Sequence, residues 1–480
     1  MKRSVWFAVI IAIVLASPAA AGWSATPYLK PYMQLDLPVL AAPLADPYEV
    51  GEQRTFWGWD LSGMPPANIQ FTATCRGASD FGYVFVADAL WGDAMDQDDV
   101  DAVLEAWDET SPAGSVDPDS GIYDIEVELF GDPPDTDGVP GVVLLYYEMN
   151  CFMGTCFDGF YRYDDQTAGP YSNEMDMVHL DPTVNDPGDD YMLGVAAHEF
   201  NHMLQMVHDV NETAWLSESL AEAAMIVTGY DTDTGWLADF AADPTTGFFG
   251  DETNVHYGAA LLLGTYLYEA GGATLLQAVT ADSDNGVESI ENHLPAGDVD
   301  NFGEFFGDMA LAAAADFFVE QLDATTAAQQ AYQYRLLSVG ELNWTEPSES
   351  GKAETSWQTT LPGGSMAALR FDFDTPMGAA DVALSDTNGL IEYGVFGAPD
   401  GEALAYTRFN NPDDATIECP LGAATTAVLV AANPQPAPVS LDITVTFVEA
   451  GAGDDDVTDD DTTGDDDDTT DDDIGDGCGC

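Results

Sequence analysis

The order of apolar and polar positions changes twice along the chain. From about residue 55 to residue 181, the runs "YVFVADAL", "GVVLLYYEM" and "NEMDMVHLD" predict strands, the last with alternating faces, and "DDVDAVLEAWDE" predicts a helix begun by aspartates. A strand directly before a helix is typical of layers that combine both elements. We therefore expect this part to be rich in strands and to contain one helix.

Helical spacing replaces this pattern from residue 189 to about residue 337. "GAALLLGTYLYEAGG" ends with Gly271 and Gly272, where glycine commonly terminates a helix, and "FGEFFGDMALAAAADFFVEQL" is apolar on more than one side. After Asn343 the chain returns to short β runs that are separated by Gly, Pro, Asn and Asp. Such a series is typical of a small β-sandwich.

The predicted fold class is α+β, with a mixed-sheet N-terminal part and a helical part, followed by a small all-β sandwich. The last thirty residues contain almost nothing to bury and predict a disordered acidic tail that ends in Cys-Gly-Cys. The predicted boundaries are 1–21 for a signal peptide, 22–188 for a β-rich subdomain, 189–342 for a helical subdomain, 343–450 for the sandwich and 451–480 for the tail.

The start of the chain has the pattern of an export signal. Lys2 and Arg3 precede an apolar run from Val5 to Ala16, and small residues follow up to Ala21, where we expect cleavage. No later segment offers the ~20 uninterrupted apolar residues that a membrane-spanning helix needs. We therefore expect a protein that is secreted or held at a cell surface, without a transmembrane segment in the mature chain.

Acidic residues dominate the charge, with 86 Asp and Glu against 10 Lys and Arg and a formal net charge of −76. Such a surface repels nucleic acid and anionic lipid, which excludes both as partners. It also destabilises the compact state by self-repulsion unless cations screen it. We expect salt or divalent cations to stabilise the protein.

The six cysteines of an exported chain predict disulfide bonds. Cys151 and Cys156, in "CFMGTC", can close a small loop, and Cys75 and Cys419 are a second candidate pair. The two cysteines of the tail, Cys478 and Cys480, leave three alternatives open: a bridge between them, an intermolecular disulfide, or attachment to a surface.

The strongest chemical signal is "HEFNH", residues 198–202. His198 and His202 are four residues apart, so a helix projects both imidazoles from one face, where they can bind one cation. The neighbouring apolar residues have the spacing of a helix with a core-facing side. Glu199 lies beside this face, where it can act on a metal-bound water rather than on the metal. The pattern predicts a zinc site.

Two residues compete as the third ligand. The pattern H-E-x-x-H-x-x-Q-x-x-H ends at His208, but it needs a sharp turn at a glycine, and Gln205 occupies that position. A straight helix places His208 roughly 240° around the axis from His202. Glu218 lies on a second predicted helix after the break "DVNET", and Glu222 follows one turn later. We therefore favour Glu218 as ligand and Glu222 as hydrogen-bond acceptor for a ligating imidazole.

"HEFNH" followed by "WLSESLAE" resembles the gluzincin metallopeptidases. More closely, "HEFNHMLQMVHD", "NETAWLSESLAE", "GDPPDTDGVPGVVLLYYEM" and "SNEMDMVHLD" are similar to secreted bacterial metallopeptidases of the immune-inhibitor-A-like and hyicolysin-like kind, over roughly residues 55–337. The spacing to Glu218 is shorter than in thermolysin-like enzymes, and Ser219 stands where a glycine is common. The resemblance implies a zincin-like metallopeptidase region in residues 22–342.

The predicted activity is that of an exported zinc endopeptidase acting on protein or peptide substrates, secreted or located at the bacterial cell surface. Glu199 is the expected general base. Similar enzymes use a tyrosine or histidine from the region after the ligands to stabilise the oxyanion, and "NVHYG" offers His256 and Tyr257, of which we favour Tyr257.

Two other functions compete with this one. The first is a surface binding protein whose metallopeptidase fold has lost activity, and the second is a calcium-dependent adhesin. Calcium is therefore a second candidate cofactor, with Asp132, Asp135 and Asp137 in "DPPDTDGVPG" as the acidic residues available to it. This stretch lacks the spaced oxygen ligands of an EF-hand loop, which favours a simple turn before a strand.

Overall fold

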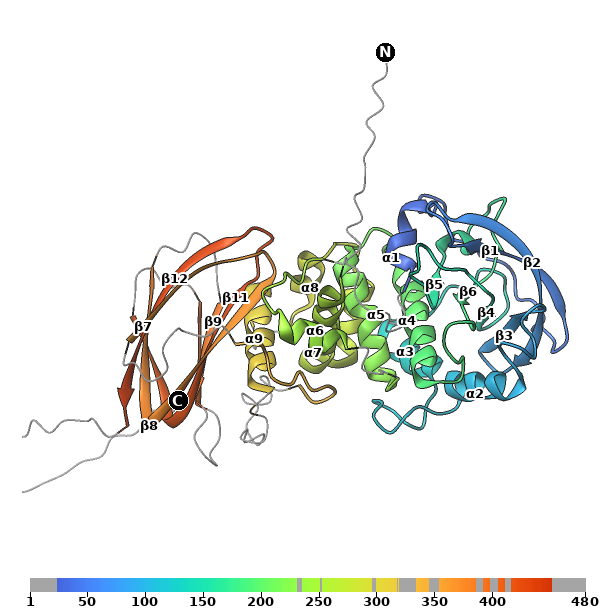
Figure 1. Ribbon diagram of the computed structural model, residues 1–480. Coiled ribbons are helices and arrows are strands. Elements are labelled where there is room, and N and C mark those ends of the chain that lie inside the picture. Colours follow the sequence, from blue (N-terminus) through green and yellow to red (C-terminus); the bar gives the residue numbers. More distant parts are fainter. Residues whose placement is uncertain are drawn as a thin grey trace, which may run out of the picture.

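The computed structural model places three blocks in a row, a mixed sheet, a group of helices and a second sheet (Figure 1). It describes residues 24–230, 235–250, 253–295, 299–316, 318, 334–344, 354–385, 392–397, 405–410 and 416–450. The predicted signal peptide and the acidic tail with Cys478 and Cys480 lie outside the described residues. Within these ranges, no helix combines the length and the apolar character needed to cross a membrane.

The first sheet has six strands in the order β1-β2-β3-β4-β6-β5. The strands are β1 (Gln53–Asp60), β2 (Ala67–Ala78), β3 (Gly82–Ala87), β4 (Val142–Tyr146), β5 (Gly159–Tyr161) and β6 (Met177–Leu180). The pairs β3–β4 and β4–β6 are parallel, and the other pairs are antiparallel, so the sheet is mixed. The short strand β5 forms one edge.

The prediction of alternating faces for the strand at residue 177 is wrong. All four residues of β6 are buried. The strand lies between β4 and β5, and helix α4 (Asp190–Met206) packs on it, so it has no solvent-exposed face. Interior strands of this kind are apolar on both sides.

The N-terminal part contains more helix than the sequence predicted. The expected helix is α2 (Gln97–Asp108), where Asp96 and Asp99 form a reciprocal capping box with the first backbone N–H groups. A second helix, α3 (Ile122–Phe130), was missed, so the prediction of one helix is wrong. Two short helical turns, α1 (Thr26–Leu29) and η1 (Lys30–Tyr32), precede the sheet, and η2 (Tyr163–Gln166) follows β5.

The central block is helical, as predicted from residue 189 onward. After α4 come α5 (Ala214–Thr228), α6 (Trp236–Ala242), α7 (Asn254–Thr280), α8 (Val287–His293) and α9 (Phe302–Ala315). Helix α7 is interrupted at Gly272, which has φ 60° and ψ −158°, and then continues to Thr280. Gly272 therefore ends one helical stretch at the predicted position, and a second stretch follows directly after the kink.

The strands predicted after Asn343 form a separate antiparallel sheet in the order β10-β9-β11-β8-β12-β7. They are β7 (Glu354–Leu361), β8 (Ser365–Ser385), β9 (Glu392–Gly397), β10 (Ala405–Asn410), β11 (Thr416–Asn433) and β12 (Val439–Glu449). Strands β9 and β11 pack on α9. Arg408 of β10 adds ion pairs to Asp308 at 2.8 Å and Glu304 at 3.4 Å on that helix.

The cysteines behave differently from one another. Cys151 and Cys156 form the predicted disulfide. The pairing of Cys75 with Cys419 is wrong, because both are buried free thiols. Cys75 lies in β2 and Cys419 in β11, and the helical block separates these two sheets (Figure 1).

Candidate metal centre

Helix α4 brings the two histidines into the interior. It follows Asp189, and every residue from Met192 to Met206 is buried, including His198 and His202. Strand β5 approaches this helix closely, because a Cβ added at Gly159 would lie 2.8 Å from Val195 and 3.1 Å from Glu199. Glycine at residue 159 therefore lets the sheet edge lie directly against the H-E-x-x-H segment.

Helix α5 returns across α4 after a break that ends at Thr213. The side-chain amide of Gln205 donates to the backbone oxygen of Ser217 at 3.0 Å and to Asn201 at 2.6 Å, which ties the end of α4 to the first turn of α5. This contact brings Glu218 to the histidines. Gln205, which stands where a turn glycine would be needed for ligation by His208, thus holds the second helix in place.

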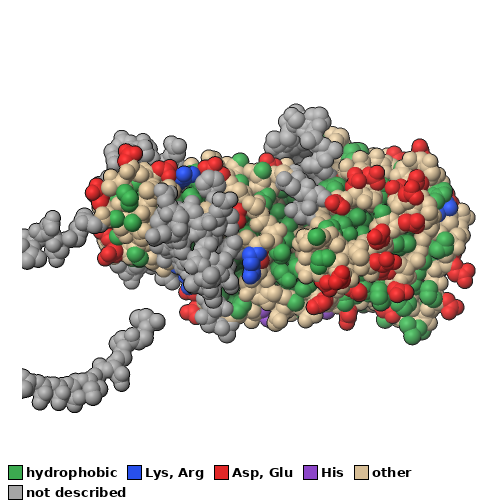
Figure 2. Space-filling view, turned by 90° about the horizontal axis from the view of Figure 1, so that it is seen from below, with side chains coloured by type: hydrophobic (Ala, Val, Ile, Leu, Met, Phe, Trp, Pro, Cys, Tyr) green, Lys and Arg blue, Asp and Glu red, His purple; other side chains and the backbone are tan. Residues whose placement is uncertain are grey.

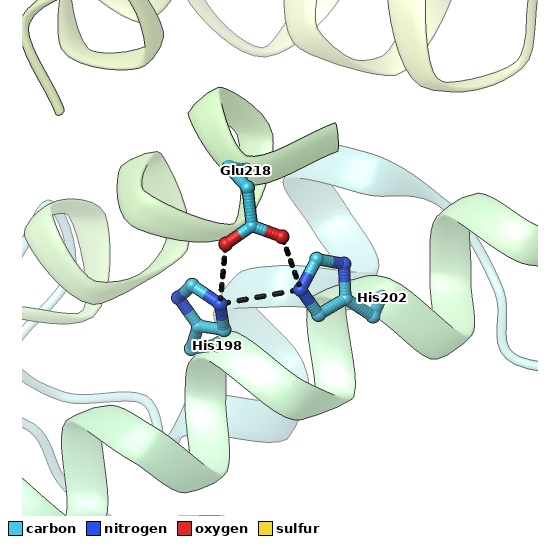
Figure 3. A group of neighbouring side chains, drawn as sticks. All are labelled: His198, His202 and Glu218. Atoms are coloured by element: carbon cyan, nitrogen blue, oxygen red, sulfur yellow. Dashed lines mark hydrogen bonds and ion pairs between the residues drawn. The ribbon is translucent and has the colours of Figure 1, made fainter. Parts of the chain in front are cut away.

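Three side chains converge in Figure 3. The Nε2 atoms of His198 and His202 are 3.2 Å apart. The carboxylate of Glu218 lies between them, with Oε1 at 3.2 Å from His202 Nε2 and Oε2 at 3.5 Å from His198 Nε2. All three residues are buried and offer one ligand atom each within 4.8 Å of the others.

The geometry fits a small tetrahedral cation. Zinc with ligand distances of ~2.0–2.1 Å places neighbouring ligand atoms about 3.3 Å apart. The three separations of 3.2, 3.2 and 3.5 Å lie close to this value. Two imidazoles and one carboxylate also leave a fourth position open, which is typical of catalytic rather than structural zinc sites.

The electrostatics of the group favour an added positive charge. Burial alone would raise the pKa of Glu218, but the charge of His202 and hydrogen bonds from both imidazoles lower it to about 2. Burial also opposes protonation of His198, yet Glu218 and Glu222 raise the pKa of that imidazole well above its ordinary value. The buried carboxylates of Glu218 and Glu222 therefore favour a positive charge at the imidazoles.

The second nitrogen of each histidine has a partner on α5. His198 Nδ1 lies 3.4 Å from Oε1 of Glu222, the residue predicted to accept a hydrogen bond from a ligating imidazole. His202 Nδ1 lies 3.3 Å from the hydroxyl of Ser217. The sequence analysis missed Ser217, although its place next to Glu218 was a usable signal. Such contacts fix the ring orientation of ligating histidines.

Glu199 lies next to the group but is engaged by other residues. Its Oε2 accepts hydrogen bonds from the hydroxyl of Thr26 at 2.7 Å and from the backbone N–H of Tyr161 at 2.9 Å. Within the described part of the chain, its Oε1 has no hydrogen-bond partner. No local sequence pattern indicated the contact with Thr26, which lies 173 positions away in the chain.

The two remaining candidates are His208 and Tyr257. His208 is exposed beyond the end of α4, as expected for a residue that does not bind the metal. Tyr257 is buried near the start of α7, where its ring packs on Trp236 with centroids 4.7 Å apart. Packing at the start of the helix is the alternative to a role of Tyr257 in oxyanion stabilisation.

A second acidic group contains Asp135, Asp137 and Asp176 rather than the predicted set with Asp132. Its oxygen atoms lie within 4.8 Å of one another. Asp176 is buried, which raises its pKa to about 7, and it accepts hydrogen bonds from the backbone and hydroxyl of Thr136 at 2.7 and 2.6 Å. These bonds fix the turn before β4 from within the protein.

Comparisons with known proteins leave the function open. No family model and no curated protein matches the chain. Among solved structures, the chain is similar to PliG of Aeromonas hydrophila, a periplasmic inhibitor of g-type lysozyme, with 11% identity, TM-score 0.17, and coverage of 21% of this chain and 93% of that chain. PirA matches with 13% identity, TM-score 0.16, and coverage of 21% and 97%. At these TM-scores the likenesses support no argument about fold or function.

Proposed function

We propose that the protein is an exported zinc-dependent endopeptidase of the gluzincin type. The observation that carries the proposal is the spacing of His198, His202 and Glu218, which fits tetrahedral zinc with one open position. The resemblance of "HEFNH" and "WLSESLAE" to secreted bacterial metallopeptidases supports the same conclusion. In this proposal the mixed sheet and the helices form a zincin-type catalytic region, and the second sheet, which is a single antiparallel sheet rather than the predicted sandwich, belongs to an accessory domain.

Bound zinc would supply Lewis-acid polarisation and lower the pKa of water toward ~7. Glu199 would accept the proton of the attacking water through Oε1, the oxygen that no described residue engages, and return it to the leaving nitrogen. Glu222 and Ser217 hold the two imidazoles in orientation through their Nδ1 atoms. Tyr257 stays the candidate donor to the oxyanion.

Strand β5 gives a physical reason for a peptide substrate. It is an edge strand, and its backbone lies against Glu199 through the N–H of Tyr161. An extended peptide can add to such an edge by main-chain hydrogen bonds, which places its carbonyl groups next to the general base. The alternative is a binding protein that retains the metal without turnover, in which Tyr257 would only pack on Trp236.

Metal analysis and digestion of casein test the proposal. We expect one zinc per chain in the wild type and in Glu199→Gln, with hydrolysis of casein lowered at least 100-fold in the variant, because the substitution removes the base but no ligand. A protein without stoichiometric zinc would contradict the proposal. A zinc protein as inert as its variant, both intact and after limited proteolysis, would support the binding protein.

A further inference from the structure

Side chains from other segments cover the outer edge of strand β1 at two positions. β1 is the last strand of the mixed sheet, and Figure 1 shows it on the side of the sheet away from α5, α6 and α7. The hydroxyl of Tyr147 accepts a hydrogen bond from the N–H of Trp59 at 2.9 Å and donates to the oxygen of the same residue at 3.1 Å. The side-chain amide of Asn173 binds both main-chain groups of Trp57 in the same way, at 2.8 and 2.9 Å. These two side chains take the place of a further strand.

The main-chain groups of Thr55 face the same edge without such a cover. Residues of an antiparallel strand alternate between facing the partner strand and facing away from it, so the N–H and C=O of Thr55 point in the same direction as those of Trp57 and Trp59. Among the residues that the structure describes, none forms a hydrogen bond with either group, and Thr55 is exposed. Open main-chain groups at a sheet edge can pair with an extended peptide.

A pocket of about 290 Å³ opens at this position. It is lined by residues 54–57 of β1 and by three residues that precede β6, namely Ser172, Asn173 and Met175. This volume is at the lower end of the range for ligand sites, so the pocket has room for the end of a peptide rather than for a whole strand. Asn173 also donates to Asp165 at 2.6 Å, which holds its amide in place beside Trp57. A peptide that pairs with Thr55 must therefore end before it reaches Trp57.

Arg54 supplies a positive charge at the pocket. Its guanidinium group lies over the ring of Tyr48, 4.5 Å from the centroid, and its Nε pairs with Glu52 at 2.6 Å. Its two Nη atoms form no hydrogen bond or ion pair with any residue that the structure describes. The Nη atoms of Arg76, by contrast, include one that pairs with Asp88 at 3.3 Å. Arg54 therefore keeps donors available for a carboxylate, which arginine binds through two parallel hydrogen bonds.

We propose that this pocket binds the C-terminal end of an extended peptide, with the peptide carboxylate on Arg54 and the peptide main chain paired with Thr55. A free amino terminus would instead bring a second positive charge next to the guanidinium group. The bound peptide runs parallel to β1, because this direction brings its last residue toward Trp57. The pocket shares no residue with the candidate metal centre, and its binding of peptides does not depend on the proposed peptidase function.

Fluorescence anisotropy of two dansylated alanine tripeptides tests the proposal, one with a free C-terminal carboxylate and one with a C-terminal amide. The full chain carries Glu199→Gln and a chelator is present, so that neither hydrolysis nor a metal at the candidate centre affects the result. We expect the free acid to bind about tenfold more tightly than the amide, because the amide cannot form the charged hydrogen bonds with Arg54. Equal affinities, or no binding of the free acid at millimolar concentration, would overturn the proposal.

Three further substitutions in the same chain locate the site. Arg54→Gln should abolish the preference for the free acid, whereas the matched control Arg76→Gln should keep it, because Arg76 does not line the pocket. Thr55→Pro should weaken the binding of both peptides about tenfold, because proline lacks the outward N–H and the substitution removes no hydrogen bond to β2. A preference for the free acid that persists in Arg54→Gln would place the carboxylate elsewhere and contradict the proposal.

Discussion

At the scale of single residues, the two ring nitrogens of His198 face two different glutamates. Nε2 faces Glu218 at 3.5 Å, and Nδ1 faces Glu222 at 3.4 Å. Removing Glu218 would delete a ligand, whereas removing Glu222 would leave the ligand set complete and loosen only the ring. Loss of Glu218 should therefore lower the metal affinity more than loss of Glu222.

We predict a corresponding order of zinc retention. Glu218→Ala should lower zinc affinity more than about 100-fold, and Glu222→Gln should lower it about 10- to 100-fold. His208→Ala is the matched control and should leave the affinity unchanged, because its side chain is exposed beyond the end of α4. Competition with a chromogenic chelator measures all three, and a larger loss in His208→Ala than in Glu218→Ala would reverse the assignment.

Site residues that lie close together in the chain could be predicted from the sequence. Contacts between segments that are distant in the chain were missed. His198 and His202 are one helical turn apart, so their common face follows from helix geometry alone. The contact of Ser217 with His202 depends on the angle at which α5 crosses α4. The hydrogen bond from Thr26 to Glu199 joins residues at a separation of 173 positions, and no local pattern encodes it.

At the scale of elements, Asp158 connects the edge of the sheet with α4. Its carboxylate accepts hydrogen bonds from Tyr191 of α4 at 2.8 Å and from Asn185 at 2.8 Å. The side chain is fully buried, and burial raises its pKa to about 6 in spite of both hydrogen bonds. The folded protein therefore holds a proton on Asp158 more strongly than the unfolded chain does.

This difference predicts a stability that falls with pH. Below pH ~4 the carboxyl is protonated in both states, and the contribution is fully present. It is lost as the pH rises through about 6, because the folded state must then give up the proton; the loss is on the order of 3 kcal/mol for a shift of two pKa units. Urea unfolding between pH 4 and 7.5 measures the free energy of unfolding of the wild type and of Asp158→Asn. The fall in this free energy with rising pH should be smaller in the variant, which has no carboxyl group at residue 158. Parallel profiles would contradict the assignment.

Long periodic elements were predictable, and short or doubly buried ones were not. The helices around residues 98–109 and 190–206 have clear apolar spacing and aspartates at their starts. Helix α3 has only nine residues and lies between loops, so its pattern was too short to notice. The four residues of β6 are buried because of what packs on both faces, and that packing is not encoded in their alternation.

At the scale of the whole molecule, acidic side chains are scattered over the visible surface of the mixed-sheet end among hydrophobic and other groups, with few lysines or arginines (Figure 2). The chain carries a formal net charge of −76. The few basic residues make specific contacts, such as buried Arg162 with Asp165 and partly exposed Arg408 with Asp308. We therefore expect solvent cations, rather than the protein's own basic residues, to screen the surface repulsion.

The melting temperature should rise with salt. Raising NaCl from 0.1 to 1 M shortens the Debye length from about 10 to about 3 Å, which removes most of the repulsion between surface carboxylates. Differential scanning calorimetry with a chelator present measures this effect without a contribution from bound divalent ions. A melting temperature that stays constant or falls over this range would show that self-repulsion does not limit stability.

The composition was enough to predict an acidic surface. The arrangement of the two sheets and the helical block between them could not be predicted from the sequence. The proposed bridge between Cys75 and Cys419 was wrong because it required the two sheets to meet, and the helices lie between them. The position of the second sheet on α9 depends on contacts such as that between Gly394 and Leu311, where an added Cβ would lie 2.7 Å from the leucine. Such complementarity of shape leaves no trace in spacing.

The amide of Gln205, which ties α4 to Ser217, has a consequence for thermodynamic coupling. With this clamp in place, the donor atoms of both histidines and of Glu218 are preorganised before any ion arrives. Metal binding is then not required to drive folding. In small metal-nucleated domains, by contrast, the chain folds only when the metal is bound. If the centre binds zinc as proposed, chelation should empty it while the polypeptide keeps its architecture, and metal loading and folding would be separable equilibria.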